Sequence, residues 1–410
     1  MNSILFTYKQ IKSRPLSSAL HIILFATGIT IISLVSLLKD SFENQLDKNA
    51  GGIDLVVGAK GSPLQLILSG LYHIDYPVGN IDYAEATELS KHPLIKQAIP
   101  LALGDNYKGF RIVGTNTAYP ALYKGQTEAG RLWQKDFEVT IGSKVAARTR
   151  LTIGDRFSGI HGLSAESDHV HEDMLYTVAG IFKETGTTLD QLILTNMESV
   201  WEIHHDEHDE HHDEDDEHGD EDDHEHEHAE MPKEITTLLI QYQNPMGAVT
   251  LPRLVNSSTN MQAASPAQEI NRLYSLLGIG IQTLTFLSGF IIFISALSIF
   301  ISLLNSLKER KYELALIRVM GGSRLRLFSA LILEGVSFAI PGYIVGFVIS
   351  RLAMLSLSSY TDHTFNYTLQ GGVTSTDLYL FGASLLIGIL AAMIPAFKAM
   401  NTNISKTLSQ

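Results

Sequence analysis

The chain is 410 residues long, has a formal net charge of −14 and contains no cysteine. Without cysteine, disulfides, thiolate metal sites and cysteine nucleophiles are excluded. The negative charge is local, because residues 202–230 hold 17 Asp and Glu and no Lys or Arg, which leaves 30 basic against 27 acidic residues elsewhere. No basic patch with interleaved aromatic residues is present, so no nucleic-acid partner is predicted.

Four stretches are apolar over about 20 residues or more, the length at which a helix crosses the hydrocarbon core of a bilayer. The first is too long for a signal peptide, and no small-residue cleavage site follows it. Lys and Arg gather before the first stretch, between the second and third, and after the fourth, and such residues favour the cytoplasmic side. The loop after the third stretch has only Arg351, at its border. Both termini are therefore predicted to be cytoplasmic.

These patterns predict a membrane protein with four transmembrane α-helices and an α+β extracytoplasmic domain between helices 1 and 2. The predicted segments, in chain order, are a cytoplasmic amphipathic helix (1–16), the first transmembrane helix (17–38), the extracytoplasmic domain with its stalks (39–274), the second transmembrane helix (275–305), a cytoplasmic coupling loop (306–326), the third transmembrane helix (327–350), an external loop (351–377), the fourth transmembrane helix (378–400) and a cytoplasmic tail (401–410). Helical stalks are expected at 39–48 and 262–274.

Inside the extracytoplasmic segment, runs of β-branched and aromatic residues are typical of strands. They occur at 110–114, 137–141, 176–182, 189–194 and 235–242. Helical patterning at 83–91 and at 143–150 completes the α+β pattern.

Residues 54–81 form an apolar segment that glycines and prolines interrupt. We expect a buried hairpin, with an interfacial helix or a contact patch for a partner as alternatives. The pair Gly58 and Gly61 does not form a phosphate loop, because no Gly-Lys-Ser/Thr sequence follows it.

Two ionisable residues, His21 and Glu334, fall inside the predicted spans, where such groups are functional candidates by default. His21 is close to the cytoplasmic edge and is expected to reach the interface. Glu334 is further inside its helix and remains the intramembrane candidate. Two isolated groups do not form a proton relay or an ion path, which counts against a channel or a secondary transporter.

A tract of histidine interleaved with Asp and Glu lies between the predicted strands at 189–194 and 235–242. Its histidines are His204, His205, His208, His211, His212, His218, His224, His226 and His228. With almost nothing apolar to bury, residues 202–230 are predicted to be a disordered loop. Imidazole and carboxylate ligands suit zinc, and the irregular spacing predicts several weak sites instead of one closed site. No intrinsic cofactor is predicted, and the alternative for the tract is a solvated charge run that binds nothing.

The predicted cytoplasmic loop has the pattern of a short amphipathic helix. Leu314, Ile317 and Met320 recur on one helical face, with charged residues on the others. Gly321 and Gly322 end this helix, and Ser323 is a suitable N-cap for the next one. A rigid helix at this place could dock into a groove of a cytoplasmic subunit.

Residues 308–323, KERKYELALIRVMGGS, resemble the hallmark motif of the MacB/FtsX-type ABC permeases, the type VII ABC superfamily. Glu313, Arg318 and Gly321 fall on matching positions, whereas Met320 and Gly322 depart from the motif. Glu334 resembles a glutamate early in the family's third span. The segments 141–146, 153–155 and 176–182 are similar to the family's periplasmic core domain, here with a histidine-rich insert.

The resemblance implies a permease subunit in the bacterial inner membrane, multi-pass, with its large domain in the periplasm. It implies a homodimer and a separate ABC ATPase, since the chain has neither a Walker A motif nor an ABC signature. The permease itself is not an enzyme and has no catalytic residue. The resemblance also implies that residues of the cytoplasmic loop couple to the ATPase: Glu309, Arg310, Glu313, Arg318 and Gly321.

Because of the histidine-acid tract, we expect the permease to work in a zinc- or divalent-metal-linked transport system. A periplasmic metal-binding or outer-envelope protein is then expected as a further partner. Two alternatives stay open. One is a mechanotransmitting regulatory scaffold that transports nothing, and the other is a lipoprotein or efflux-type permease with no metal substrate.

Overall fold

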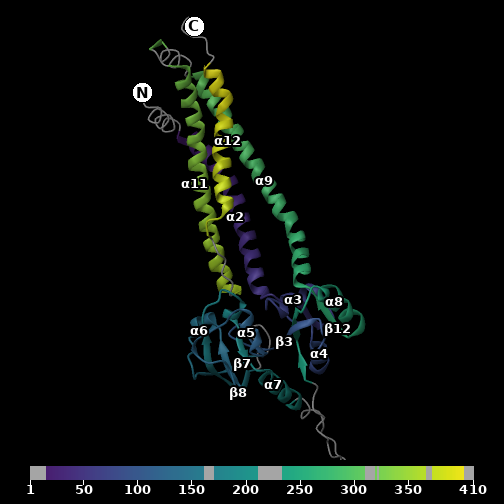
Figure 1. Cartoon of the computed structure of the whole chain (residues 1–410). Helices are drawn as coiled ribbons and strands as arrows, with labels where there is room; N and C mark the ends of the chain where they lie inside the picture. The colour runs from purple at the N-terminus through teal and green to yellow at the C-terminus, as the bar shows by residue number, and fades with distance from the viewer. Residues whose placement is uncertain are drawn as a thin grey trace, which may run out of the picture. The chain divides into compact units, whose positions relative to one another are not determined.

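The computed structural model describes residues 15–160, 170–210, 233–309, 319–320, 323–365 and 372–400. The chain divides into two compact units. The helical unit comprises Met1–Glu43 with Leu276–Gln410, and the α/β unit comprises Asn44–Ser275. Two long helices, α2 and α9, contribute residues to both units (Figure 1).

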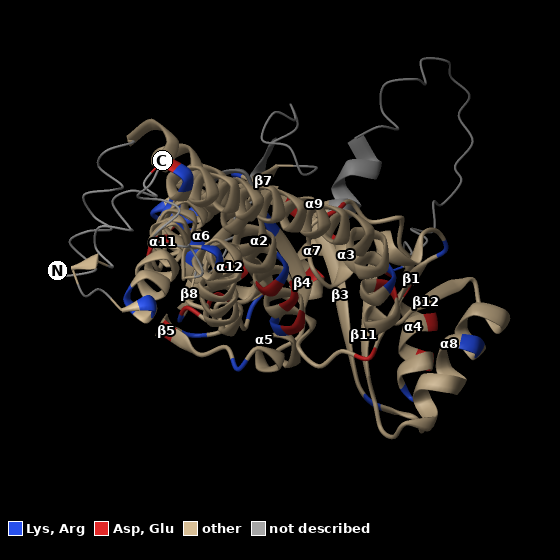
Figure 2. Cartoon of the chain, turned by 90° about the horizontal axis from the view of Figure 1, so that it is seen from above, with Lys and Arg blue, Asp and Glu red and all other residues tan. Residues whose placement is uncertain are grey.

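Four helices make up the described part of the helical unit: α2 (Pro15–Ala50), α9 (Pro266–Glu309), α11 (Arg324–Phe365) and α12 (Ser375–Met400). Each is long and apolar enough to cross a membrane. Figure 2 colours Lys and Arg blue and Asp and Glu red on the ribbon, most of which is tan. The predicted external loop 351–377 differs from the structure, because α11 continues to Phe365. No glycine or proline lies between Arg351 and Phe365, so nothing in the sequence ends the helix at residue 350.

Close approach of backbones holds these helices together, as small residues permit in membrane bundles. A Cβ atom added at Gly346 of α11 would lie 2.7 Å from the carbonyl oxygen of Ala26 in α2. At Gly388 of α12, it would lie 2.8 Å from Cβ of Ala339 in α11. Residues from three of the helices then bury Phe25 and Ile29 against Ile292. The helix α11 therefore packs directly against both α2 and α12.

The α/β unit is built on a ten-stranded mixed sheet. Along the sheet the strands follow the order β12-β1-β11-β3-β4-β9-β6-β8-β5, and β7 pairs with β3 and β8. Their bounds are β1 (Leu55–Ala59), β3 (Ile95–Tyr107), β4 (Phe110–Thr115), β5 (Thr127–Gly130), β6 (Glu138–Ile141), β7 (Arg156–Ile160), β8 (Val170–Phe182), β9 (Ile193–Thr195), β11 (Thr237–Tyr242) and β12 (Met261–Ala264). A small second sheet pairs β2 (Ile81–Asp82) with β10 (Glu234–Ile235).

Short helices accompany this sheet. They are α3 (Pro63–Gly70), α4 (Tyr83–Ser90), α5 (Ala118–Leu122), α6 (Ser143–Thr149), α7 (Met197–Glu210) and α8 (Met246–Ser258), with a 3₁₀ turn, η1, at Thr188–Gln191. The sequence predicted two of them correctly, at 83–91 and 143–150.

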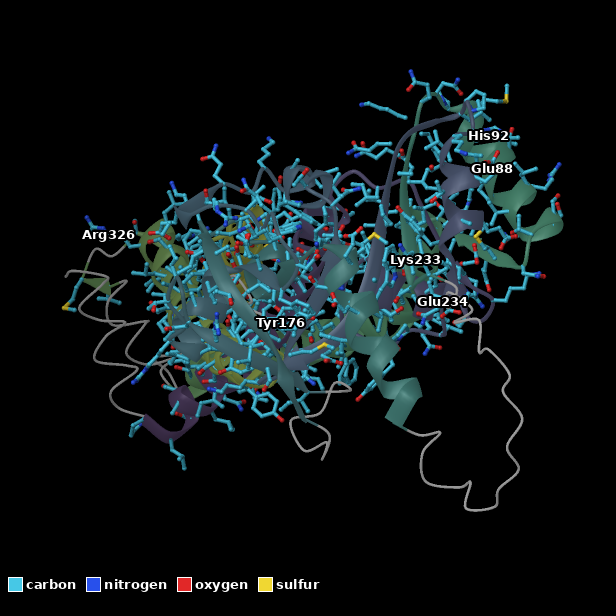
Figure 3. All side chains as sticks on the ribbon, turned by 90° about the horizontal axis from the view of Figure 1, so that it is seen from below. Glu88, His92, Tyr176, Lys233, Glu234 and Arg326 are labelled. Atoms are coloured by element: carbon cyan, nitrogen blue, oxygen red, sulfur yellow. The ribbon has the colours of Figure 1, made fainter. Side chains whose placement is uncertain are left out.

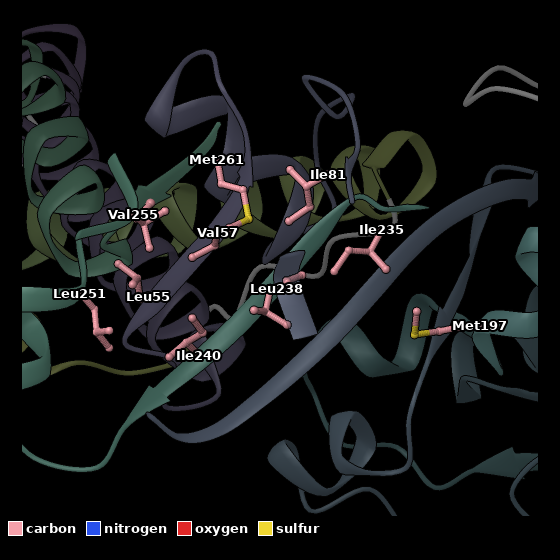
Figure 4. Close-up of a cluster of buried hydrophobic side chains, with 12 residues drawn as sticks. Leu55, Val57, Ile81, Met197, Ile235, Leu238, Ile240, Leu251, Val255 and Met261 are labelled. Atoms are coloured by element: carbon pink, nitrogen blue, oxygen red, sulfur yellow. The ribbon is translucent and has the colours of Figure 1, made fainter. Parts of the chain in front are cut away.

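Among the described residues of the α/β unit, buried hydrophobic side chains form two separate cores. The first core contains the inner side chains of β1, β11 and β12 together with Leu251 and Val255 of α8 (Figure 4). The second core contains Ile112, Val139, Tyr176 and Ile193, from β4, β6, β8 and β9. Since β12 leads directly into α9, that helix starts from the first core.

Three predictions for the α/β unit were wrong in detail. The segment 54–81 is not a hairpin: it is strand β1 followed by helix α3, which Ser62 caps by accepting a hydrogen bond from Gln65 N. Ser before Pro63 is a helix-start signal that the glycine-rich surroundings obscured. The stalk predicted from residue 262 begins at Pro266, because the buried side chains of Met261 and Ala263 belong to strand β12.

The third error concerns residues 189–194, which were expected to be one strand. The structure has the turn η1 first, and β9 begins only at Ile193. The cause is Asp190, a 1% exposed residue whose carboxylate accepts hydrogen bonds from the backbone N–H groups of Thr185 and Gly186. A side chain that collects backbone donors in this way favours a turn over a strand.

Candidate functional site

The predicted coupling residues lie mostly outside the described residues. This applies to Arg310, Glu313, Arg318 and Gly321, whereas Glu309 is the exposed last residue of α9. On the other side of the gap, Ser323 caps α11 as predicted, with Arg326 N donating to Ser323 Oγ over 3.3 Å. The structure therefore fixes both ends of the coupling segment, at Glu309 and at Ser323.

The histidine-acid tract begins on a helix. His204, His205 and His208 belong to α7, while the other six histidines lie outside the described residues. Residues 202–210 thus differ from the predicted disordered loop, because Met197, Val200 and Ile203 recur on one buried face and hold the helix against the unit. Within the described part of the chain, no group of three or more metal-ligating side chains is present.

Both ends of the tract are attached at one place. After the tract the described chain resumes at Lys233, whose ammonium lies 5.0 Å from the ring centroid of Trp201 on α7. Trp201 Nε1 also donates a hydrogen bond to the carbonyl oxygen of Glu234 over 2.6 Å. Figure 3 shows Lys233 and Glu234 side by side. The tract is therefore an insertion whose start and end are held together by the α/β unit.

The two intramembrane candidates are both buried. Glu334 is 5% exposed on α11. His21 is also 5% exposed, so its side chain is buried among the helices instead of extending from the protein surface. Its Nε2 lies 3.2 Å from Ser17 Oγ, and its Nδ1 lies 3.1 Å from Ser298 Oγ on α9. Since both ring nitrogens have hydroxyl partners, His21 is a satisfied interior residue that ties α2 to α9.

A buried ion pair, which sequence reasoning missed, joins three helices of the helical unit. Arg351 of α11 pairs through Nη2 with Oδ2 of Asp377 in the first turn of α12. Ser33 of α2 donates to Asp377 Oδ1 over 3.3 Å, and Ser350 donates to Ser33 over 3.1 Å. Thr374 N donates to Asp377 Oδ2 over 2.8 Å. We call Ser33, Ser350, Arg351 and Asp377 the Arg351 cluster.

The Arg351 cluster provides Arg351 with a partner of opposite charge inside the helical unit. Arg351 was the exception to the distribution of basic residues, and Asp377, at 3% exposed, supplies the opposite charge. The only sequence signal was one charge at each end of the predicted external loop. A buried charge is tolerated when it is paired and hydrogen-bonded, so the cluster makes this end of the bundle one connected structure.

The α/β unit buries an ionisable side chain without an opposite charge. His73 is partly buried, and desolvation together with the positive charge of Arg111 lowers the pKa of His73 to about 3. Its Nε2 lies 2.8 Å from Tyr119 Oη. Arg111 donates from Nη2 to the carbonyl oxygen of Asp75 over 2.6 Å, and burial lowers the pKa of Arg111 to about 10. His73 is therefore neutral at physiological pH and acts as a hydrogen-bonding group.

One surface ion pair has a defined geometry. Arg131 binds Glu138 through two hydrogen bonds of 2.7 and 2.6 Å. The hydrogen bonds from Arg131 lower the pKa of Glu138 to about 2, and backbone N–H groups of Gln134 and Lys135 assist. This pair connects the start of β6 to the segment after β5 and is structural in character.

Comparison with known proteins locates one family on the chain. Residues 285–404 match the model of the FtsX-like permease C-terminal family. The match runs from the second half of α9 through α11 and α12, and so includes Glu334, Arg351 and Asp377. No curated protein matches the sequence.

Two solved structures are similar to part of the chain. The periplasmic region of MacB from Actinobacillus actinomycetemcomitans has a TM-score of 0.33 and 10% identity, covering 55% of this chain and 94% of its own. The extracellular domain of the noncanonic ABC-type transporter YknZ from Gram-positive bacteria has a TM-score of 0.31 and 13% identity, covering 52% of this chain and 98% of its own.

Proposed function

We propose that this chain is the permease subunit of an ABC transporter of the MacB/FtsX type in a bacterial inner membrane. The observation that carries the proposal is the match of residues 285–404 to the FtsX-like permease C-terminal family, on helices apolar enough to span a membrane. In this proposal the α/β unit lies in the periplasm. The chain contains no Gly-Lys-Ser/Thr sequence, so a separate ATPase subunit hydrolyses ATP and the permease is not itself an enzyme.

The proposed mechanism transmits motion through the helices. ATP binding closes two ATPase subunits, and this closure displaces the cytoplasmic segment between α9 and α11. Glu309, Arg310, Glu313, Arg318 and Gly321 form the contact with the ATPase. Both α2 and α9 contain residues of the helical unit and of the α/β unit, so a displacement in the membrane reaches the α/β unit along them. Glu334 remains a candidate for a role inside the bundle.

A homodimer is part of the proposal. The described bundle leaves large apolar side chains of α9 uncovered: Phe286 is 79% exposed and Phe293 62% exposed. Such a face is stable against lipid or against a second copy of the chain.

A second candidate function links the permease to zinc or another divalent metal. It rests on the nine histidines among acidic residues between His204 and His228. Neutral imidazole binds zinc, so affinity falls as the histidines become protonated below about pH 6.5. The loop would receive or buffer the metal outside the cytoplasm, with a periplasmic metal-binding or outer-envelope protein as its partner. A regulatory scaffold, or an efflux or lipoprotein permease without a metal substrate, are the competing functions.

Purification of the chain with its ATPase tests the coupling proposal. The permease is expected to stimulate ATP hydrolysis, and Glu313→Ala with Arg318→Ala is expected to reduce that stimulation about tenfold, a typical size for coupling between sites. Glu88→Ala, an exposed carboxylate of α4, is the matched control and leaves the stimulation unchanged. If the double variant stimulated ATP hydrolysis as fully as wild type, Glu313 and Arg318 would have no role in coupling.

Deletion of residues 204–228 tests the metal proposal. Titration calorimetry on the full chain is expected to show loss of most zinc binding, while the α/β unit stays folded. Binding that persists would move the sites to His161, His169 and His171. A deletion strain that grows normally under zinc starvation would contradict the metal link and leave the permease proposal in place.

A further inference from the structure

The last turn of α2 is hydrogen-bonded to other parts of the α/β unit through one buried residue. Asn49 is 3% exposed. Its Oδ1 accepts hydrogen bonds from Thr188 N over 3.1 Å and from Gln45 Nε2 over 3.2 Å. The main-chain carbonyl oxygen of Asn49 accepts a third hydrogen bond, from Tyr123 Oη over 3.0 Å. A residue near the end of a helix thus satisfies donors from two other parts of the unit.

The segment that Asn49 contacts, residues 185–190, is held by several hydrogen bonds of its own. Asp190 gathers Thr185 N over 2.8 Å, Gly186 N over 2.7 Å and Thr185 Oγ1 over 2.9 Å. Gln45 Nε2 adds a hydrogen bond to the carbonyl oxygen of Gly186 over 3.1 Å. We call residues 185–190 the Asp190 turn. The turn leads into β9, where Ile193 is part of the second core.

Tyr123 extends the attachment into the interior. Its ring packs edge-on against Tyr119, with centroids 5.5 Å apart, and Tyr119 in turn contacts His73. Burial raises the pKa of both tyrosines. The Tyr123 hydroxyl therefore stays protonated and remains a donor to Asn49 at any physiological pH.

After α2 the main chain does not continue into the Asp190 turn but into the first core. After Ala50 the chain turns at Gly51 and Gly52, whose φ angles are +57° and +73°, and enters β1 in the first core. The helix α9 also starts from the first core, directly after β12. Asn49 thus ties α2 to the Asp190 turn and the second core, whereas α9 has its attachment in the first core.

We infer that Asn49 is a positioning residue that fastens the end of α2 to the Asp190 turn, so that displacement of α2 moves the second core and displacement of α9 moves the first. The inference rests on the proposed permease function, because it assigns the two helices to separate parts of the α/β unit. The glycine pair after Ala50 lets the backbone into β1 bend while the Asn49 contacts hold.

Hydrogen exchange on the purified full chain tests the attachment without any ATPase. Asn49→Ala is expected to speed exchange of the amides of the Asp190 turn about fivefold, the factor for loss of one ordinary net hydrogen bond. Tyr123→Phe, which removes a single hydroxyl, is expected to have a smaller effect in the same direction. Lys48→Ala, an exposed neighbour on α2, is the matched control. Unchanged exchange in Asn49→Ala would overturn the inference and leave the proposed function standing.

A covalent replacement tests whether the attachment transmits motion. In the complex with the ATPase, ATP is expected to change exchange in β12 of the first core and in β6 and β8 of the second. Asn49→Ala is expected to abolish the change in β6 and β8 and to keep that in β12. Because the chain has no native cysteine, a disulfide between Asn49→Cys and Thr188→Cys would be the only one it could form. The oxidised pair restores the response of β6 and β8, and the reduced pair does not.

Three outcomes count against the inference. A full response of β6 and β8 in Asn49→Ala, or a failure of the oxidised pair to restore it, would overturn the role of Asn49 alone, since β12 still reports coupling. No ATP-dependent change anywhere in the wild-type complex would overturn the proposed function and the inference with it.

Discussion

The helical unit and the α/β unit bury ionisable side chains by different means. In the helical unit, Arg351 forms an ion pair with Asp377, and the hydroxyl of Ser33 is hydrogen-bonded to both side chains. In the α/β unit, His73 has no carboxylate partner and instead loses its proton, with a pKa of about 3. Between two apolar helices a charge can persist only as a pair, whereas a histidine can become neutral at small cost near its ordinary pKa.

The difference separates two kinds of sensitivity. The Arg351 cluster depends on both partners being present, because removal of one leaves the other buried and unpaired. His73 depends on pH, because the unfolded chain binds a proton that the folded chain excludes. Substitution of a charged residue should therefore lower stability more in the helical unit, and acidification should lower it more in the α/β unit.

The largest effect is expected at the Arg351 cluster. Asp377→Leu or Arg351→Met alone should lower the free energy of unfolding of the protein in mild detergent by about 3–5 kcal/mol, since each leaves an uncompensated buried charge. The double variant should recover most of this loss, because both charges are then gone. Thermal unfolding of the three purified proteins measures the comparison.

Arg326→Met is the control for this prediction, because Arg326 is an exposed arginine of the same helix. It should change the stability by less than about 0.5 kcal/mol. A double variant as unstable as the single ones would show that the two side chains do not act as a pair.

The next effect concerns pH and the α/β unit. The pKa of His73 is lowered from 6.5 to about 3, so below pH 6.5 the unfolded state binds more protons and stability falls as pH falls. Each pH unit in this window costs about 1.4 kcal/mol, or about 2 kcal/mol at pH 5. Urea unfolding of wild type and His73→Asn at pH 7 and pH 5 isolates the contribution. Asn stays neutral and tolerates the left-handed backbone of residue 73, whose φ is +55°.

His73→Asn should therefore lose about 2 kcal/mol less than wild type between pH 7 and pH 5. Equal losses in the two proteins would mean that residue 73 does not exclude the proton, and the contrast between the units would fail.

The smallest effect is expected at the surface pair of Arg131 and Glu138. The pKa of Glu138 is lowered to about 2, so its contribution is present above about pH 4.3 and is lost as pH falls toward 2. Glu138→Gln should cost less than about 1 kcal/mol at pH 7, because surface pairs contribute little. The variant and wild type should converge in stability near pH 2, which acid unfolding followed by circular dichroism measures. A cost that stays constant down to pH 2 would assign the effect to packing.

Sequence patterns identified the elements that depend on local chemistry. The helix start at Ser323 followed from its side chain and the glycines before it, and α4 and α6 followed from periodicity. Sequence-based predictions differed from the structure where the hydrogen bonds of one buried side chain decided the local arrangement. The hydrogen bonds to Asp190 form the turn η1 where a strand was expected. His21, which was expected at the interface, is hydrogen-bonded to serines among the helices. Ser298 lies 277 positions from His21, so no local pattern predicts that contact.

By itself, the sequence determined four spans long enough to cross a bilayer, the acidic tract and the likeness of the cytoplasmic segment to a permease family, because each depends on neighbouring residues. The tertiary structure alone decided which side chains meet. Arg351 finds Asp377 26 positions away, Asn49 finds Thr188 139 positions away, and Ser33 reaches Asp377 across 344. Those partners are set by which helices and strands pack together, since burial leaves a polar group stable only beside another that satisfies it.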